Sequence, residues 1–313
     1  MTNSQYESIV SLYFILSKSL SVTKKNTKFS DLLALTKPRL SALVIVTAAG
    51  GWWLAPSSEN WLKGLYAVLG TTLTVCAANT MNNYLERESD KLMSRTQNRP
   101  LPTGRLAPSA ALWFGLFLTA ISIPALTLLT NPLTGLLAAI ALITYVIIYT
   151  PLKRVSSYNT LIGAIPGAMP PLIGWTAATN SIDLGGLLLF AILFLWQIPH
   201  SLAITIYRQS EYDKAGLVVL PSERGLEATR FQMLFYTLAI VPLPMLLYLT
   251  NVTWLCTFVV GTALGCWWLW KAVQGFIKQL GAKWARQFFL SSLVYLLALF
   301  VVMTIDGIIM LVL

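Results

Sequence analysis

NNYLERESDKLMSRTQNRPLPTGR, from Asn82 to Arg105, is a polar island in an otherwise apolar chain, and it decides how the chain is organised. Three acids and five bases lie within it, although only 11% of all residues are charged and 56% are hydrophobic. Asn82, Glu86 and Asp90 are spaced four apart, which predicts that their oxygen atoms share one face of a helix. This face is a candidate site for a divalent cation, and the arginines that follow are candidate phosphate ligands.

The sequence on both sides of this island consists of apolar runs long enough to cross a membrane. Nine spans are expected, at roughly residues 32–54, 61–84, 109–129, 132–149, 159–178, 184–207, 228–249, 253–272 and 286–312. The predicted fold is therefore an all-α bundle of membrane helices over residues 31–313. Residues 1–30 form a polar tail that lacks the features of a cleaved signal peptide and is expected to be retained on the cytoplasmic side.

The positive charges of the chain gather at one end of the predicted spans. Of the 22 lysines and arginines, only Lys63 lies near the opposite end. Because basic residues stay on the cytoplasmic side, we expect a cytoplasmic N-terminus, an external C-terminus and a location in a bacterial inner membrane. This placement also explains the net charge of +10 without a nucleic-acid partner. The lipid bilayer is the expected surrounding.

A second polar loop, YRQSEYDKAGLVVLPSERG from Tyr207 to Gly225, follows the sixth span. Its LPSER segment at 220–224 repeats the LPTGR segment at 101–105, and the two loops are four spans apart. An even offset preserves chain direction, so the halves are expected to be parallel repeats with both loops at the same end of the bundle.

Carboxylates of the two loops are expected to face one another across a cavity. The second loop supplies Glu211 and Asp213, and opposed acidic faces repel unless cations lie between them. Mg²⁺ suits this role because proteins hold it with one or two carboxylates plus the phosphate oxygens of a substrate. Phosphate charge would be neutralised further by basic residues of the loops, which are Arg95, Arg99, Lys153 and Arg154.

These motifs resemble the UbiA superfamily of intramembrane prenyltransferases. The resemblance rests on Asn82-x-x-x-Glu86-Arg-x-x-Asp90, on RTxxRPL at 95–101, and on the second acidic loop. Further segments narrow it to the branch that farnesylates haem, and the resemblance covers the chain from about residue 31 onward. The segments that narrow the resemblance are TKPR at 36–39, YTPLKR at 149–154, GAIPGAMPPLIGW at 163–175, WQIPH at 196–200 and EYDKAGLVVLP at 211–221. The chain departs from the pattern at Glu86 and Glu211, where aspartate is common, and at Ser210, where a second acid often stands.

The resemblance implies Mg²⁺-dependent transfer of farnesyl from farnesyl diphosphate to a vinyl group of haem B, which yields haem O. The implied metal ligands are Asn82, Glu86, Asp90 and Glu211, which with Lys153 are also the implied catalytic residues. The implied substrate-binding residues are Arg87, Arg95, Arg99, Tyr149, Arg154, Trp196, His200, Tyr207, Arg208 and Tyr212. Aromatic faces would shield an allylic cation from water. Association with other haem-biosynthesis or oxidase-assembly proteins stays open.

His200, the one histidine of the chain, lies inside the sixth predicted span. It is the only imidazole available to ligate haem iron, or it could hydrogen-bond haem or the added water. A helix–helix hydrogen bond is the other interpretation that the sequence allows. We expect His200 to act on the haem side of the reaction because it lies several turns from the charged loops.

Other functions remain open at this point. An acceptor that is an aromatic acid or a quinone precursor would keep the same reaction class. A transporter also uses parallel repeats, but its charges are expected at mid-membrane rather than in terminal loops. A haem-binding assembly protein would need His200 but not the two charged loops.

Overall fold

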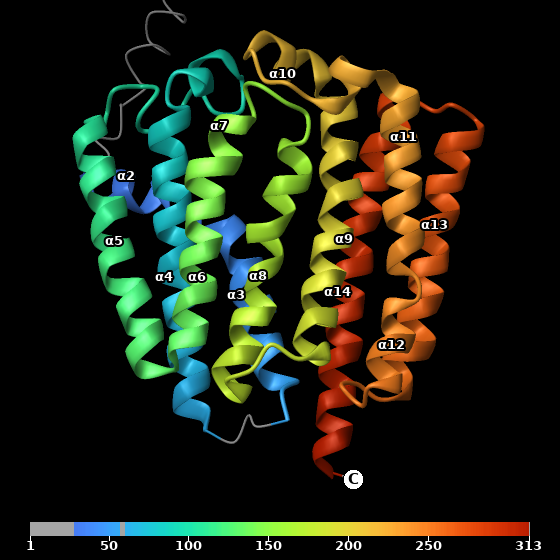
Figure 1. Ribbon diagram of the computed structural model, residues 1–313. Helices are drawn as coiled ribbons and strands as arrows, with labels where there is room; N and C mark the ends of the chain where they lie inside the picture. Colours follow the sequence, from blue (N-terminus) through green and yellow to red (C-terminus); the bar gives the residue numbers. More distant parts are fainter. Residues whose placement is uncertain (1–27, 57–59, 313) are drawn as a thin grey trace, which may run out of the picture.

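Helices are the regular secondary structure of the described chain, which comprises residues 28–56 and 60–312 of a computed structural model (Figure 1). Most of the predicted tail therefore lies outside the described residues. The elements are α2 (Lys28–Leu35), α3 (Pro38–Trp53), α4 (Trp61–Glu86), η1 (Ser89–Leu92), α5 (Pro108–Leu129), α6 (Pro132–Ile143), η2 (Thr144–Tyr149), α7 (Thr150–Leu152), α8 (Asn159–Thr179), α9 (Leu184–Tyr207), α10 (Gln209–Lys214), α11 (Leu220–Ile240), α12 (Leu243–Leu249), η3 (Thr257–Gly261), α13 (Thr262–Ile277) and α14 (Ala282–Val312).

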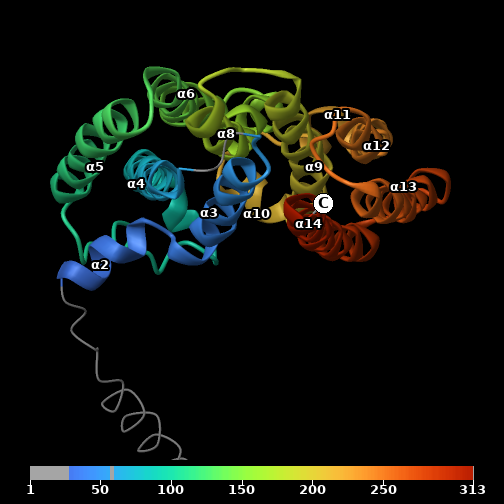
Figure 2. The same ribbon diagram turned by 90° about the horizontal axis from the view of Figure 1, so that it is seen from below.

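Long helices stand side by side, and seen along their axes they form a curved row (Figure 2). α5, α4 and α6 lie toward one end of this row, α8 and α9 lie near its middle, and α11 to α14 lie toward the other end. The two polar loops meet at the same end of the bundle, where η1, α7 and α10 are found (Figure 1). The expectation that both loops share one end is confirmed.

Seven helices of the described chain are long and apolar enough to cross a membrane. The polytopic all-α fold is thus confirmed, but the prediction of nine spans is not. The first predicted span contributes only the short apolar helix Ser41–Trp53, and the eighth, over η3 and α13, is not among the seven. The eighth is less apolar toward its end because it carries Lys271 and Gln274.

The prediction of one continuous first span, 32–54, is wrong at Lys37, where α2 ends and α3 begins. Lys37 adopts a left-handed backbone conformation, with φ of 51° and ψ of 58°. Proline disfavours the right-handed helical conformation in the residue before it, and Pro38 follows directly. The break directs the side chain of Lys37 toward α4, which is important for the site described below.

α3 and α8 approach each other closely. A Cβ atom on Gly51 would collide with the backbone oxygen of Pro171, and one on Gly174 would collide with the backbone oxygen of Ala48. Glycine at these two positions is therefore required for the contact. Aromatic rings of α13 and α14 stack on one another: the ring centroids of Trp268 and Phe288 lie 5.1 Å apart. α14 also packs against α9.

Candidate active site

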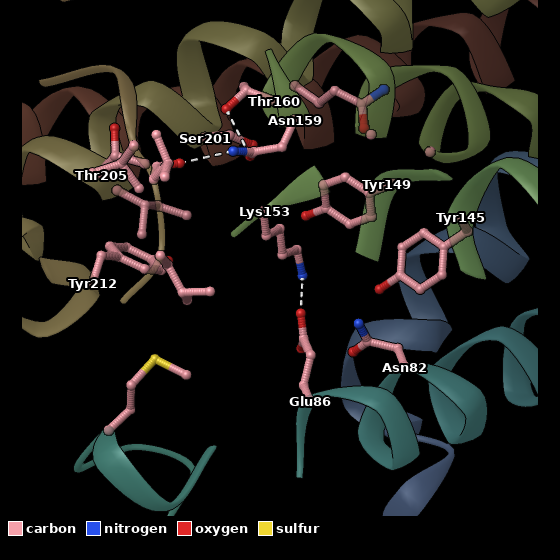
Figure 3. Close-up of a pocket in the computed structure, with 18 of the residues that line it drawn as sticks. Asn82, Glu86, Tyr145, Tyr149, Lys153, Asn159, Thr160, Ser201, Thr205 and Tyr212 are labelled. Carbon is pink, nitrogen blue, oxygen red and sulfur yellow. Dashed lines mark hydrogen bonds and ion pairs between the residues drawn. The ribbon is translucent and has the colours of Figure 1, made fainter. Parts of the chain in front are cut away.

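A cavity of about 350 Å³ opens beneath the polar loops and is lined by residues from both halves of the chain. Figure 3 shows that α4, the segment after η2, α8, α9 and the second loop all contribute side chains to it. Eight of the sequence-predicted residues line it: Asn82, Glu86, Asp90, Arg95, Arg99, Tyr149, Lys153 and Tyr212. The fold thus brings together the first loop, the YTPLKR segment and part of the second loop.

The acidic side chains of the first loop are held by basic residues. Lys153 Nζ lies 2.6 Å from Glu86 Oε1, and this pair is visible in Figure 3. Arg99 Nη1 lies 2.7 Å from Asp90 Oδ2. The other carboxylate oxygen of Asp90, Oδ1, is buried and has no hydrogen-bond partner. A buried carboxylate oxygen without a partner is an available ligand for a cation.

The amide of Asn82 is also occupied. Its Oδ1 accepts a hydrogen bond of 2.9 Å from Lys37 Nζ, and its Nδ2 donates to Thr150 Oγ1 over 3.2 Å. Sequence reasoning did not assign Lys37 to the site, although the TKPR segment contains it. The hydrogen bond between Lys37 and Asn82 depends on the break between α2 and α3, which a pattern of apolar residues does not reveal.

The predicted single helical face of Asn82, Glu86 and Asp90 is wrong in one respect. α4 ends at Glu86, and Asp90 lies in the short 3₁₀ helix η1. Hydrogen bonds from Thr96 Oγ1 to the Asp90 backbone oxygen and from Arg99 to its carboxylate tie this segment to the following loop. All three side chains still line the cavity.

Positive charge exceeds negative charge in the cavity lining. Lys37, Arg99 and Lys153, together with Arg95, oppose only the two carboxylates named above. Burial, and after it the charge of Arg99, lowers the pKa of Lys37 from its ordinary value to about 7. Burial by itself also lowers the pKa of Lys153, but the neighbouring Tyr149 and Glu86 outweigh it and raise that pKa. An anion bound here would favour the charged forms of both lysines.

The second loop presents a phenol to the cavity rather than its carboxylates. Tyr212 lines the cavity, and burial raises the pKa of its hydroxyl. Glu211 does not line it but lies 3.3 Å from Arg208 Nη1, and Asp213 accepts a hydrogen bond of 2.6 Å from Ser222 Oγ. Consecutive side chains on a helix such as α10 point about 100° apart. Tyr212 therefore faces the cavity, whereas its neighbours Glu211 and Asp213 do not. A metal-binding role for Glu211 stays a prediction.

Several other predicted residues lie outside the cavity lining. Arg87 caps the end of α4, where its Nη1 donates to the backbone oxygen of Tyr84 over 2.7 Å. Arg154 lies in the turn after α7, and its backbone nitrogen donates to the Pro151 oxygen. Trp196 and Tyr207 face α14: Trp196 Nε1 donates to the Ser292 backbone oxygen, and the ring of Tyr207 meets that of Phe289 edge-on.

His200 is held against α14. Its Nδ1 lies 2.7 Å from Ser292 Oγ, and its ring lies between those of Trp196 and Phe289, with centroids 4.5 and 4.8 Å away. This is the helix–helix hydrogen bond that the sequence left as one interpretation. A role on the haem side stays a prediction, and in this arrangement it would use the other ring nitrogen, Nε2.

The face of α9 that does line the cavity is polar and was missed by sequence reasoning. It carries Gln197, Ser201 and Thr205, which recur every four residues. Gln197 Nε2 donates to the backbone oxygen of Ala164 over 2.7 Å. Polar residues at this spacing within an apolar span were the available signal.

Two tyrosines of the π-helix η2 form one wall. The rings of Tyr145 and Tyr149 lie 5.2 Å apart, and the ring of Tyr149 lies 4.3 Å from Lys153 Nζ. Tyr145 was not predicted. It precedes Tyr149 by four residues, and both line the cavity (Figure 3).

A second, apolar cavity of about 230 Å³ adjoins the first. The two share Tyr145 and Gly167. The second follows α4 from Asn79 back to Thr74, and eight residues of helix place Thr74 about 12 Å deeper than Asn82. Its lining is completed by Ser41, Val44, Val75, Ala78, Ala141, Leu142, Pro166 and Pro170.

Metal ligation in this site requires oxygen atoms from elsewhere. Within the described part of the chain, no three histidine, cysteine or carboxylate side chains gather in a way that could hold a metal ion. Mg²⁺ does not require such a cage, because it commonly uses one or two carboxylates plus substrate phosphates. Glu86 and Asp90, with the unpartnered Oδ1 of Asp90, fit that pattern.

Sequence comparison finds a matching family and similar proteins. The UbiA prenyltransferase family model matches residues 43–293. A protoheme IX farnesyltransferase of Myxococcus xanthus (strain DK1622) is 50% identical over 280 residues, covering 90% of this chain and 95% of the relative. The protein of the same name from Anaeromyxobacter dehalogenans (strain 2CP-C) is 45% identical, covering 87% and 92%.

Solved structures share the fold. A digeranylgeranylglyceryl phosphate synthase superposes with a TM-score of 0.77 at 16% identity, covering 90% of this chain and 99% of its own. A UbiA homologue from Archaeoglobus fulgidus, bound to GPP and Mg²⁺, superposes with a TM-score of 0.63 at 15% identity, covering 88% and 99%. At these identities the likeness concerns the fold alone.

Proposed function

The chain belongs to the UbiA prenyltransferase family, and we propose that it transfers the farnesyl group of farnesyl diphosphate to a vinyl group of haem B, forming haem O. The observation that carries this proposal is the adjacency of the two cavities, whose linings share Tyr145 and Gly167. A cation-rich chamber adjoins an apolar one, which suits a ligand with a diphosphate at one end and a hydrocarbon chain at the other.

In the proposed reaction the bond between C1 of farnesyl and the diphosphate oxygen breaks, and its electron pair leaves with the diphosphate. C1 then bonds to the terminal carbon of the vinyl group. Water supplies the hydroxyl on the neighbouring carbon, and the proton that it loses leaves with the diphosphate. Charge develops on the leaving oxygen, so stabilisation there lowers the barrier.

Lys37, Arg99 and Lys153 are placed to stabilise that leaving charge, since all three line the polar chamber. Arg99 can bind two oxygens at once, whereas a lysine acts as a point charge. When bound beside Glu86 and Asp90, Mg²⁺ would neutralise further charge on the diphosphate oxygens.

Tyr145 and Tyr149 would face the allylic carbon. Tyr145 lines both cavities, and its ring lies 5.2 Å from that of Tyr149, which lines the polar one. An aromatic face stabilises a neighbouring cation electrostatically, and the chamber walls exclude water that would otherwise trap it.

The two substrates would approach from different sides. The farnesyl chain would lie in the apolar cavity along α4, beneath Asn82. The acceptor would then lie toward α9, whose Gln197 and Ser201 offer polar contacts to a porphyrin. In this arrangement His200, which lies on the α14 side of α9, would act on the acceptor from outside the polar chamber.

The setting of the proposed site is a membrane. We propose nine crossings, with α3 and α13 added to the seven long helices, because α3 packs along α8 and α13 packs along α11. Basic residues of the loops would place the site on the cytoplasmic side of a bacterial inner membrane.

Incubation of the purified protein in detergent with farnesyl diphosphate and Mg²⁺ tests the function. Parallel reactions contain haem B or 4-hydroxybenzoate, and products are identified by mass spectrometry. We expect haem O from the first and no prenylated product from the second. Prenylated 4-hydroxybenzoate without haem O would instead support the aromatic-acid alternative.

A further inference from the structure

Each oxygen-bearing side chain that the first loop offers to a metal already has a partner from the same chain. Lys37 binds Asn82, Lys153 binds Glu86, and Arg99 binds one oxygen of Asp90. The three bases come from three segments, and each partner distance is 2.9 Å or less. The acids are therefore neutralised before any ligand arrives.

Charge in the chamber favours an anion over a cation as the first ligand. Four basic side chains and two carboxylates line it, which leaves an excess of two positive charges when every base is protonated. A divalent cation entering alone would meet this excess and would have to displace Lys153 from Glu86. Removing one partner of a buried ion pair is unfavourable because the other charge is left uncompensated.

A diphosphate entering alone would be attracted by this excess of positive charge, although drawing the bases from Glu86 and Asp90 would leave both carboxylates uncompensated until a cation binds. It can accept hydrogen bonds from Lys153, Arg99 and Lys37 in exchange for their present partners, and phosphate oxygens are strong acceptors of charge-assisted bonds. The exchange would release the carboxylates of Glu86 and Asp90 at the moment when phosphate oxygens become available as additional metal ligands.

We propose that Mg²⁺ and the prenyl diphosphate bind with positive coupling, because Lys153 occupies Glu86 and Arg99 occupies one of the two Asp90 oxygens until the diphosphate draws both bases away. This inference rests on the proposed function, since it takes a prenyl diphosphate as the anion. It adds a role to the two bases: each holds an acid in the empty site and contacts the diphosphate in the filled one. By linkage, each ligand must raise the affinity for the other by the same factor.

The test measures each ligand without the other. Binding of Mn²⁺ alone, as a probe for Mg²⁺, is followed by electron paramagnetic resonance. Binding of farnesyl thiodiphosphate, which reacts slowly, is followed by calorimetry in EDTA. In the wild-type protein we expect weak Mn²⁺ binding and measurable analogue binding.

Lys153→Met gives the decisive comparison. Removal of the base exposes Glu86, so Mn²⁺ alone should bind about tenfold more tightly, while the analogue in EDTA should bind about tenfold more weakly. Lys153→Arg keeps the cation and should resemble the wild type in both measurements. Lys91→Met is the matched control, because Lys91 pairs with the exposed Glu88 outside the chamber.

Opposite changes in the two affinities would support the proposal. Equal weakening of both ligands in Lys153→Met, or tight Mn²⁺ binding by the wild type without diphosphate, would overturn it. Haem O formation is measured separately in each variant. Failure of the coupling with normal haem O synthesis leaves the proposed function intact, whereas absence of haem O in the wild type rejects that function whatever the coupling.

Discussion

His200 Nδ1 and Ser292 Oγ are 2.7 Å apart, so the one histidine of the chain is fixed to α14 through one ring nitrogen. Flanking by Trp196 and Phe289 restrains the ring further. His200 therefore lies at the boundary between α9 and α14, outside the charged chamber.

His200→Ala should reduce haem O formation while the affinity for farnesyl diphosphate changes less than about threefold, which is below about 0.7 kcal/mol. The reason is position, because His200 does not line the chamber that holds the proposed diphosphate-binding residues. Paired titrations of haem and of farnesyl diphosphate check this. Ser292→Ala, which keeps the ring but removes its partner, is the control for orientation. Normal haem farnesylation in His200→Ala would leave only the structural hydrogen bond.

Glu86→Gln and Asp90→Asn should each lower turnover by about 10²-fold, which corresponds to about 2.7 kcal/mol of barrier. Both substitutions keep size but remove the negative charge that would hold Mg²⁺. Glu88→Gln is a matched control, because Glu88 is exposed and pairs with Lys91. Single-turnover rates at saturating substrate measure the effect. Near-normal rates for both variants would be incompatible with a metal site at these acids.

Glu211→Gln should lower turnover less than Asp90→Asn does. Glu211 lies outside the chamber and pairs with Arg208, whereas Asp90 lines the chamber and has an unpartnered oxygen. The two variants are compared at several Mg²⁺ concentrations. An equal loss in both, relieved by high Mg²⁺, would mean that the second loop turns its carboxylate inward when ligands bind.

Ala141→Phe should shift the preference of the protein from farnesyl toward geranyl diphosphate. Ala141 lines the apolar cavity of about 230 Å³, and a phenyl ring there would remove part of the space for the longer chain. The ratio of kcat/KM for the two donors is the measurement. Ile140→Phe, on the neighbouring exposed face, is the control. An unchanged ratio in Ala141→Phe would place the farnesyl chain elsewhere.

Cysteine labelling should find residue 95 on the cytoplasmic side and residue 181 on the external side. The expectation follows from the gathering of basic residues at one end of the bundle. Single cysteines are introduced after replacement of Cys76, Cys256 and Cys266, and a membrane-impermeant reagent is applied to cells and to inverted vesicles. Labelling of both positions from the same side would contradict the proposed topology.

The amino-acid sequence alone determined the class of fold and the end of the molecule where the candidate active site lies. Apolar runs separated by charged loops specify membrane helices, since only such runs are stable in hydrocarbon. The distribution of lysine and arginine, and the four-span offset of the two loops, predicted that both loops share one end, as the structure shows (Figure 1). The motif around Asn82, Glu86 and Asp90 identified three residues that do line the chamber.

Only the tertiary structure decided which side chains of each motif face the chamber. The partner of Asn82 is Lys37, 45 residues away, and the partner of Glu86 is Lys153, 67 residues away. Such pairs depend on where helices break and how they rotate about their axes. One residue turns a helix by about 100°, so Tyr212 faces inward while Glu211 does not, and Ser201 lines the chamber while His200 meets α14. Sequence spacing predicts neighbours on one helix, whereas contacts between helices are set by packing across the whole bundle.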